Sequence, residues 1–215
     1  MESNVQFDAD GLTVNQIIPG IYLGPALSRD GQRVLIDNGI RNVINVTMES
    51  DLNFWSGETG EITYKQIPVI DENHISIIQY FDEAYEFVKS CADKNEKVYI
   101  HCHGGKSRSP TITIYAIMRL LNVPLREAHD LVLRGRSCIS PGIGFFQQLV
   151  DSEMRIRGEI SYPYDEYVVD KLVRFFGGAV SSELAKETYI ECERNGAMAT
   201  NVLMERVWGP GKVKP

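Results

Sequence analysis

The sequence predicts an α/β fold in which a central, mainly parallel β-sheet is flanked by helices and followed by a helical C-terminal extension. Short apolar runs rich in β-forming residues alternate along the chain with segments of helical periodicity. The clearest alternation is a strand, a glycine-containing loop and an apolar helix between residues 98 and 121. At 215 residues with 43% hydrophobic content, the chain can bury one full core.

Upstream of the central loop, we expect strands and amphipathic helices in alternation. Residues 1–14 are polar and Asp-rich, and they predict a flexible lead-in. The loop over 48–61 contains Phe54 and Trp55, either of which could anchor it to the core. The pattern predicts a strand, a turn and a second strand over 16–23, a helix over 28–38 that Gly39 ends, strands over 42–47 and 62–69, and a helix over 75–94.

Downstream of the central loop, helices are expected throughout. Residues 111–115 alternate like a strand, whereas residues 116–121 are apolar on all sides, so periodicity alone does not decide between strand and helix. An anion site requires a helix there, and we therefore expect one over 109–121. Further helices are expected over 124–133, 143–156, 165–176 and 182–195, the last ended by Gly196, with a frayed end over 209–212.

One stretch concentrates residues with chemical roles. From Val98 to Pro110 it reads Val-Tyr-Ile-His-Cys-His-Gly-Gly-Lys-Ser-Arg-Ser-Pro. The β-forming start, the adjacent glycines and a Pro at a first helical turn predict a strand, a tight loop and a helix N-terminus. Backbone N–H groups in such a loop form a concave positive site, which suits a phosphate dianion and also a thiolate. Cys102 would be the thiolate nucleophile at its floor, and the planar guanidinium of Arg108 can bind two phosphate oxygens.

Two plainer interpretations of this stretch compete with an anion site. Cys102 could be a small core residue at the end of a buried strand, although an Arg separated from it by five residues argues against this. Gly105-Lys106-Ser107 resembles the end of a nucleotide P-loop. That motif requires Gly at position 100, where the chain has Ile100, and we discard it.

Metal binding is a third alternative, suggested by His101-Cys102-His103. Neighbours on a strand point to opposite faces, so these three side chains do not form one ligand set. His74 and His129 lie too far off in spacing to complete it. We therefore expect no metal and no cofactor.

The same stretch carries a family resemblance. His101-Cys102-x5-Arg108-Ser109 resembles the signature of the cysteine-dependent protein phosphatases, and Ser107-Arg108-Ser109-Pro110 resembles that of their dual-specificity family. Over residues 15–157 the fold implied is protein tyrosine phosphatase-like, which leaves 158–215 as an extension of unknown role. Further family landmarks occur in order: Pro19-Gly20-Ile21-Tyr22-Leu23-Gly24, Gly39-Ile40, Val43-Ile44-Asn45-Val46, Pro68-Val69-Ile70-Asp71, Tyr80-Phe81-Asp82-Glu83-Ala84, and Ser140-Pro141 followed by Phe145 and Gln148-Leu149.

The resemblance also implies roles for single residues. It places the general acid at Asp71, with the neighbouring Glu72 as the main rival. It implies that the Ser109 hydroxyl stabilises the departing thiolate and that His101 orients the loop through hydrogen bonding. The substrate phosphate would be bound by His103, Gly104, Gly105, Lys106, Ser107 and Arg108.

The sequence departs from the family pattern at the mouth of the site and at its last helix. Gly142 stands where members commonly have Asn, which removes a side-chain cap and could loosen the loop. His103 and Lys106 add positive charge at the mouth and would favour substrates with several phosphates or acidic flanks. The alternative is that both are simply solvated loop residues.

The expected function is a phosphoprotein phosphatase that hydrolyses phosphotyrosine and phosphoserine or phosphothreonine through a cysteinyl-phosphate. One alternative is the same chemistry on a non-protein phosphate, such as a phosphoinositide, an RNA 5′ phosphate or a phosphoglucan. Another is a phosphate-binding interaction module without turnover. A phosphorylated protein would be the substrate, and a further protein partner could bind the C-terminal extension.

Composition bounds the cellular setting. The net charge of −7 weighs against nucleic-acid and anionic membrane partners. No apolar run approaches the roughly 18 residues of a membrane span, and the N-terminus lacks the pattern of a signal peptide. Four scattered cysteines predict no structural disulfide, and they favour the cytoplasm or the nucleus. Whether Cys102 oxidises onto Cys91 or Cys138 stays open.

Overall fold

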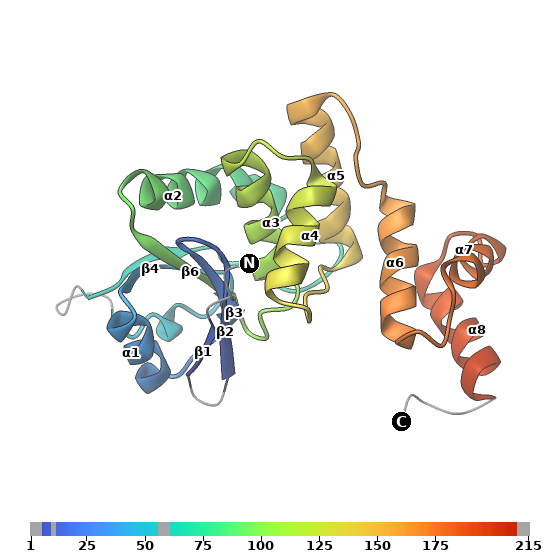
Figure 1. Ribbon diagram of the computed structural model, residues 1–215, viewed down its shortest axis with the longest axis horizontal. Coiled ribbons are helices and arrows are strands. Elements are labelled where there is room, and N and C mark those ends of the chain that lie inside the picture. Colours follow the sequence, from blue (N-terminus) through green and yellow to red (C-terminus); the bar gives the residue numbers. More distant parts are fainter. Residues whose placement is uncertain (1–5, 10–11, 56–60, 210–215) are drawn as a thin grey trace. The chain divides into compact units, whose positions relative to one another are not determined.

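The computed structural model describes residues 6–9, 12–55 and 61–209. The chain divides into two compact units, Met1–Ser161 and Tyr162–Pro215. The first contains a six-stranded sheet with helices, and the described part of the second consists of helices (Figure 1). The predicted α/β fold with a helical extension is confirmed. Within the described ranges, no helix is both long and apolar enough to cross a membrane.

The sheet of the first unit is mixed, with its parallel strands in the middle. The strand order is β1-β2-β3-β6-β4-β5. β3, β6, β4 and β5 run parallel, whereas β1 and β2 add antiparallel pairs at one edge. The strands are β1 (Gln6–Ala9), β2 (Leu12–Ile18), β3 (Ile21–Pro25), β4 (Ile40–Asn45), β5 (Thr63–Gln66) and β6 (Lys97–Cys102).

The N-terminal residues differ from the expected flexible lead-in. β1 pairs with β2 from Gln6 opposite Asn15 to Ala9 opposite Leu12. The prediction of a loose segment is therefore wrong for these residues, while residues 1–5 and 10–11 lie outside the described ranges. Aspartates interrupt the apolar alternation here, so the pairing partner, not the local sequence, determines the strand.

Helices cover both faces of this sheet (Figure 1). α1 (Arg29–Asp37) lies on one face and is capped by the Ser28 hydroxyl, which accepts a hydrogen bond from the Gly31 N–H. The other helices gather on the opposite face. They are α2 (Phe81–Asp93), α3 (Arg108–Leu120), α4 (Leu125–Gly135) and α5 (Ile143–Arg157).

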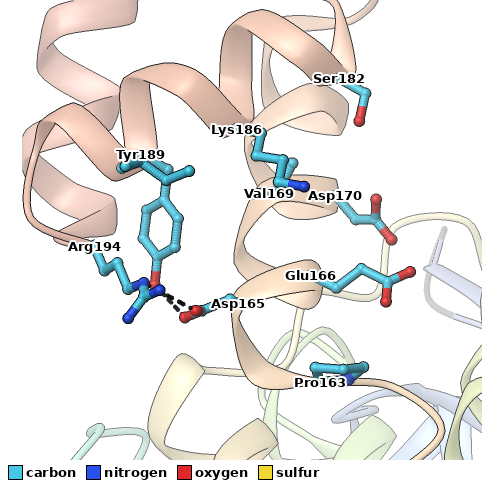
Figure 2. A pocket seen from close by; sticks show the side chains of 10 residues that line it. Pro163, Asp165, Glu166, Val169, Asp170, Ser182, Lys186, Tyr189 and Arg194 are labelled. Atoms are coloured by element: carbon cyan, nitrogen blue, oxygen red, sulfur yellow. Dashed lines mark hydrogen bonds and ion pairs between the residues drawn. The ribbon is translucent and has the colours of Figure 1, made fainter.

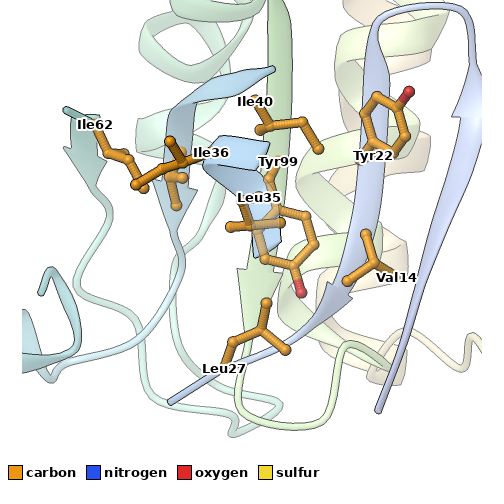
Figure 3. Packing of buried hydrophobic residues seen from close by; sticks show 9 residues of the cluster. Val14, Tyr22, Leu27, Leu35, Ile36, Ile40, Ile62 and Tyr99 are labelled. Atoms are coloured by element: carbon orange, nitrogen blue, oxygen red, sulfur yellow. The ribbon is translucent and has the colours of Figure 1, made fainter. Parts of the chain in front are cut away.

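A buried cluster joins α1 to the sheet (Figure 3). Leu35 and Ile36 of α1 pack with sheet residues that include Val43 and Tyr99. Trp55 packs against this cluster and donates its indole N–H to the Arg29 carbonyl, 3.1 Å away. The expectation that an aromatic residue anchors this loop is confirmed, although residues 56–60 of the loop lie outside the described ranges.

The central segment after the loop is a helix, as the anion-site argument required. α3 is buried from Arg108 through Met118 and packs on β6. Its strand-like alternation comes from Thr111 and Thr113, whose hydroxyls donate to the carbonyls of Ser107 and Ser109 one turn earlier. These bonds let a polar alternation stay buried inside a helix.

The second unit contains one more helix than the sequence suggested. α7 ends at Glu191, and Asn195 caps α8 by accepting a hydrogen bond from the Met198 N–H over 3.0 Å. Gly196 therefore begins a helix, so the expectation that it stops one was wrong. The helices of this unit are α6 (Tyr164–Phe176), α7 (Ser182–Glu191) and α8 (Gly196–Trp208). Most of the predicted frayed end, 209–212, lies outside the described residues.

Candidate active site

Cys102 is the last residue of β6, at the carboxyl end of the parallel strands. It is 1% exposed. The Ser109 hydroxyl, from the first turn of α3, donates a hydrogen bond to the Cys102 Sγ over 3.2 Å. The end of a strand and the start of a helix thus bring a thiol and a hydroxyl donor together.

The loop between them is held from outside through its carbonyl groups. The Ala26 N–H donates to the His103 carbonyl over 3.0 Å, and the Ser140 N–H donates to the Lys106 carbonyl over 2.6 Å. Among the described residues, the N–H groups of 103–108 make no backbone bond outside regular helices and strands. These amides are therefore available to an anion, as a phosphate-binding loop requires.

Arg136 fastens the two glycines at the tip of the loop. Its Nε donates to the Gly105 carbonyl over 2.9 Å and its Nη2 to the Gly104 carbonyl over 3.3 Å. Its Nη1 donates to the Thr13 carbonyl over 3.0 Å and to the Asn15 Oδ1 over 2.7 Å. One guanidinium therefore joins the loop to β2.

Gly105 is required at its position for two reasons. Its φ is +61°, a left-handed conformation that side chains disfavour. A Cβ there would also clash with the backbone of Gly24 and would lie 2.8 Å from the Pro25 nitrogen. The loop can therefore pack on the end of β3 only with glycine at this position.

Arg108 is 6% exposed, and its guanidinium lies against the segment that carries Val69 and Asp71. Its Nη1 donates to the Val69 carbonyl over 2.9 Å. Its Nε lies 3.5 Å from the Asp71 Oδ2, an ion-pair distance that is long for a hydrogen bond. The guanidinium is thus fixed at one end, with the segment that carries Asp71 beside it.

The structure separates the two candidate acids. Asp71 Oδ1 accepts a hydrogen bond from the Ser107 hydroxyl over 2.7 Å, which places its carboxylate at the loop. Glu72 instead pairs with His74 over 3.4 Å, and both of these side chains are largely exposed. Asp71 has the contacts expected of an acid in this site, and Glu72 does not.

His101 is buried in β6 directly before Cys102. Both of its ring nitrogens are buried and neither forms a hydrogen bond of normal geometry. The ring stacks on Tyr99 with centroids 5.7 Å apart. Burial lowers the pKa of His101 to about 4, helped by the charges of His103 and Arg108 and opposed by the Cys102 backbone. The imidazole therefore packs as a buried ring in the strand that leads to the loop. The orienting role that the family resemblance implies stays a prediction.

Charged residues line the rim of the site. His103 Nε2 lies 3.1 Å from the Glu49 Oε2, and both side chains are about half exposed. Lys106 is exposed on the same loop. One of the two expected cationic groups is therefore already paired with a carboxylate.

Comparison with known proteins shows the family of the chain. The family model "Dual specificity phosphatase, catalytic domain" matches residues 21–155. The chain belongs to the dual specificity phosphatases. Human dual specificity protein phosphatase 9 is 40% identical over 144 residues, covering 67% of this chain and 37% of that protein. Human dual specificity protein phosphatase 6 is 35% identical over 175 residues, covering 78% of this chain and 45% of that protein. The chain therefore spans less than half the length of these relatives.

Several solved structures share the fold. The human tyrosine phosphatase-like serine/threonine/tyrosine-interacting protein has a TM-score of 0.59 and 29% identity, covering 66% of this chain and 97% of that one. DUSP15 has a TM-score of 0.59 and 26% identity, covering 67% of this chain and 92% of that one. Human DUSP28 has a TM-score of 0.60 and 20% identity, covering 68% of this chain and 95% of that one, and it supports the fold alone.

Hydrogen bonds hold the start of α5 where Gly142 replaces the family's usual Asn. The Gly142 N–H donates to the Ser107 hydroxyl over 3.1 Å, so its backbone supports the loop. The Asn73 Oδ1 accepts from the Gly144 N–H over 3.4 Å and supplies the missing cap from another segment. The expected weakness is thus compensated by a residue near Asp71.

Arg136 is the site residue that sequence reasoning missed. It follows Gly135, the last residue of α4, where a Cβ would lie 3.1 Å from the Ile17 Cα on β2. This close approach brings the guanidinium to β2 and to the loop together. No periodic pattern marks it; the only sequence signal is an Arg directly after a glycine at a helix end.

A separate cavity of about 430 Å³ lies in the C-terminal unit (Figure 2). It is lined by residues of α6 and α7 together with Arg194. Asp165 accepts a hydrogen bond from the Tyr189 hydroxyl over 3.0 Å and pairs with Arg194 over 3.2 Å. The phosphate-binding loop is not part of this cavity. In the described part of the chain, no group of three or more His, Cys, Asp or Glu side chains is arranged to hold a metal ion.

Proposed function

We propose that this chain is a phosphoprotein phosphatase that works through a cysteinyl-phosphate intermediate. The supporting observation is one arrangement: the Cys102 thiol at the end of β6, Arg108 at the start of α3 beside Asp71, and the Asp71 carboxylate hydrogen-bonded to the loop. A nucleophile, an anion site and an acid are the groups that transfer of a phosphoryl group to sulfur requires.

In the first proposed step, the Cys102 thiolate attacks phosphorus in line. A bond forms between sulfur and phosphorus while the bond to the leaving oxygen breaks. Asp71 gives its proton to that oxygen and becomes a carboxylate. The amides of residues 103–108 and the guanidinium of Arg108 stabilise the negative charge on the transferring group.

In the second proposed step, water attacks the phosphorus of the cysteinyl-phosphate. Asp71, now ionised, accepts a proton from the water as the phosphorus–sulfur bond breaks. The Ser109 hydroxyl, 3.2 Å from Sγ, stabilises the departing thiolate. Inorganic phosphate is released, and both residues return to their starting protonation states.

The substrate that we propose is a phosphorylated protein carrying phosphotyrosine, phosphoserine or phosphothreonine. Family membership supports this class. Lys106 at the rim would favour acidic flanks, whereas Glu49 beside His103 limits the positive charge. The free cysteines of the chain support our proposal of a reducing compartment, the cytoplasm or the nucleus.

Hydrolysis assays test this proposal. Wild type and Cys102→Ser are assayed with an aryl phosphate, a panel of phosphopeptides and soluble inositol phosphates, in reductant and EDTA. We expect turnover of the aryl phosphate and the phosphopeptides by wild type and none by the variant. Turnover of inositol phosphates without turnover of phosphopeptides would show that the substrate is a non-protein phosphate instead.

A binding module without turnover is the second candidate, because one solved relative is named as an interacting protein. The retained Cys102, Arg108 and Asp71 argue against it, since a pure binder has no need of a nucleophile and an acid. Silence of wild type on every substrate, together with phosphopeptide binding, would favour this candidate.

A further inference from the structure

The segment that carries Asp71 lies against the first turn of α5 at a point where only glycine fits. A Cβ built on Gly144 would clash with the Asn73 carbonyl oxygen and would lie 2.6 Å from its carbonyl carbon and 2.9 Å from its Cα. These atoms belong to the backbone, so a side-chain rotation cannot relieve the overlap. Any larger residue at position 144 has to move one of the two segments.

Hydrogen bonds hold the two segments in this contact. α5 has Gly142 at its N-cap, which offers no side chain, and the Asn73 Oδ1 accepts from the Gly144 N–H instead. Further along, the Gln148 Oε1 accepts from the N–H groups of Ile77 and Ile78 over 2.8 and 2.9 Å. The start of α5 thus satisfies backbone groups that the segment after Asp71 leaves unpaired.

A second route connects the same helix start to the carboxylate itself. The Gly142 N–H donates to the Ser107 hydroxyl, and that hydroxyl donates to the Asp71 Oδ1. The Asp71 segment is therefore attached to α5 on both sides of Asn73.

We propose that Gly144 and Asn73 are positioning residues that hold Asp71 at the loop that carries Cys102 and Arg108. The inference rests on the proposed function, in which Asp71 protonates the leaving oxygen. Proton transfer requires hydrogen-bond reach, so a shift of the segment by about 1 Å would weaken it severely. The thiol and the phosphate-binding amides would stay where they are.

The chemistry gives this proposal a selective readout. A poor leaving group such as phenoxide needs the acid, whereas a strongly electron-poor phenoxide leaves with little help from it. Displacement of Asp71 should therefore slow phosphoryl transfer to Cys102 from phenyl phosphate much more than from an aryl phosphate with a good leaving group. Damage to the whole site would slow both alike.

The test compares Gly144→Ala with Asn73→Ala in the full chain, with Asp71→Asn as the reference for loss of the acid. Gly196→Ala is the matched control, because it also lies in the first turn of a helix and its new Cβ would meet only the tip of Val168 at 3.1 Å. Alanine raises helix propensity at both positions, so a loss in Gly144→Ala alone reflects the contact with Asn73.

For Gly144→Ala we expect a fall in kcat/KM of about 10²-fold on phenyl phosphate and less than about threefold on the good leaving group. We compare kcat/KM because it reports the first step, whereas kcat also contains the second step, in which Asp71 acts as the base for both substrates. The kcat/KM of Asn73→Ala on phenyl phosphate should fall by about threefold to tenfold. Gly196→Ala should match wild type on both substrates. Equal losses on both substrates, or no loss, would overturn the positioning role.

Amide hydrogen exchange gives a result that does not depend on turnover. We expect residues 70–78 to exchange faster in Gly144→Ala than in wild type, with residues 98–110 unchanged. Unchanged exchange over 70–78 refutes the inference even if the enzyme is silent on every substrate. An inactive wild type with this segment still loosened in the variant would count against the phosphatase proposal alone.

Discussion

Asp71 and Glu72 are neighbours in the sequence with different surroundings in the fold. Asp71 accepts a hydrogen bond from Ser107 and lies beside Arg108, whereas Glu72 pairs with the exposed His74. The sequence alone left the two carboxylates as rivals, because adjacent residues in a loop have no periodicity to separate them. The contact of Asp71 with the loop supports our proposal that Asp71 is the acid, as the family resemblance implies.

The first prediction follows from this contrast. Asp71→Asn should lower kcat on phenyl phosphate by roughly 10²-fold to 10⁴-fold, because the leaving oxygen then departs without a proton. Glu72→Gln, the matched control one residue away, should stay within about twofold of wild type. Steady-state kinetics of both variants checks this. A large loss in Glu72→Gln with a small one in Asp71→Asn would reverse the assignment.

His101 provides a prediction about stability and pH. Its pKa is lowered to about 4 by burial, against an ordinary value of 6.5, so the unfolded chain takes up a proton that the folded protein resists. The stability contribution of neutral His101 is complete above pH 6.5 and is lost as pH falls toward 4. Between pH 7 and 5 this loss should be about 2 kcal/mol.

Urea unfolding of wild type and His101→Asn at pH 7 and pH 5 checks this value. Wild type should lose about 2 kcal/mol more than the variant over that interval, since the variant lacks the titrating group and keeps all the others. Equal losses in the two proteins would show that His101 does not titrate as its burial requires.

Among the elements, the phosphate-binding loop depends on groups that hold it from outside. Its carbonyls are bound by Ala26, Ser140 and Arg136, and its amides remain for an anion. Arg136 reaches the loop from the end of α4 and also binds β2. The shape of the loop is thus maintained by three separate parts of the chain.

Removal of the Arg136 guanidinium should loosen this loop. Arg136→Met keeps the aliphatic stem but leaves four acceptors without their donor. We expect a loss of about 2 kcal/mol in unfolding free energy and roughly a tenfold rise in KM for an aryl phosphate. Arg136→Lys, which retains the charge but not the planar fork, should recover only part of both effects. Full recovery by Lys would show that charge alone matters.

An element could be predicted when its own local sequence specifies it, and not when distant residues do. The helix after the loop was predicted correctly, because an anion site requires a helix N-terminus at Arg108 even though Thr111 and Thr113 imitate a strand. β1 was missed because its stability comes from pairing with β2. The prediction for Gly196 was wrong because a glycine can start or end a helix. The side chain of Asn195, which caps α8, shows that the helix starts there. Arg136 joins residues more than a hundred positions apart, which no local pattern reveals.

At the scale of the whole molecule, a buried carboxylate marks where the catalytic unit ends. Glu153 is 0% exposed and its Oε1 accepts from the Leu125 N–H over 2.7 Å. The Glu153 Oε2 accepts from the Ser161 N–H over 2.8 Å, and the Glu153 Oε1 also accepts from the Ser161 hydroxyl over 2.6 Å. The family resemblance ends at residue 157, and the first compact unit runs on to Ser161, which supplies two of the donors to Glu153.

Two truncations test the proposed boundary. A chain of residues 1–163 keeps the Ser161 contacts, with its new carboxyl terminus two residues away, whereas a chain of 1–157 leaves Glu153 buried without two of its three donors. The shorter chain should be less stable by about 3 kcal/mol in urea unfolding. The longer one should keep activity on an aryl phosphate within about threefold, because every proposed site residue lies before Ser161. Equal stability of the two would contradict the role of Ser161.

The covalent intermediate is the most direct test of the account as a whole. Wild type is mixed with an aryl phosphate in the presence of EDTA, and the reaction is quenched in acid within milliseconds. The protein is then digested, and its peptides are analysed by mass spectrometry. We predict one phosphoryl group on the peptide that contains Cys102, absent in Cys102→Ser and longer-lived in Ser109→Ala, in which the departing thiolate loses its hydrogen-bond donor. Turnover without any phosphoryl group on Cys102 would contradict the mechanism proposed for this fold.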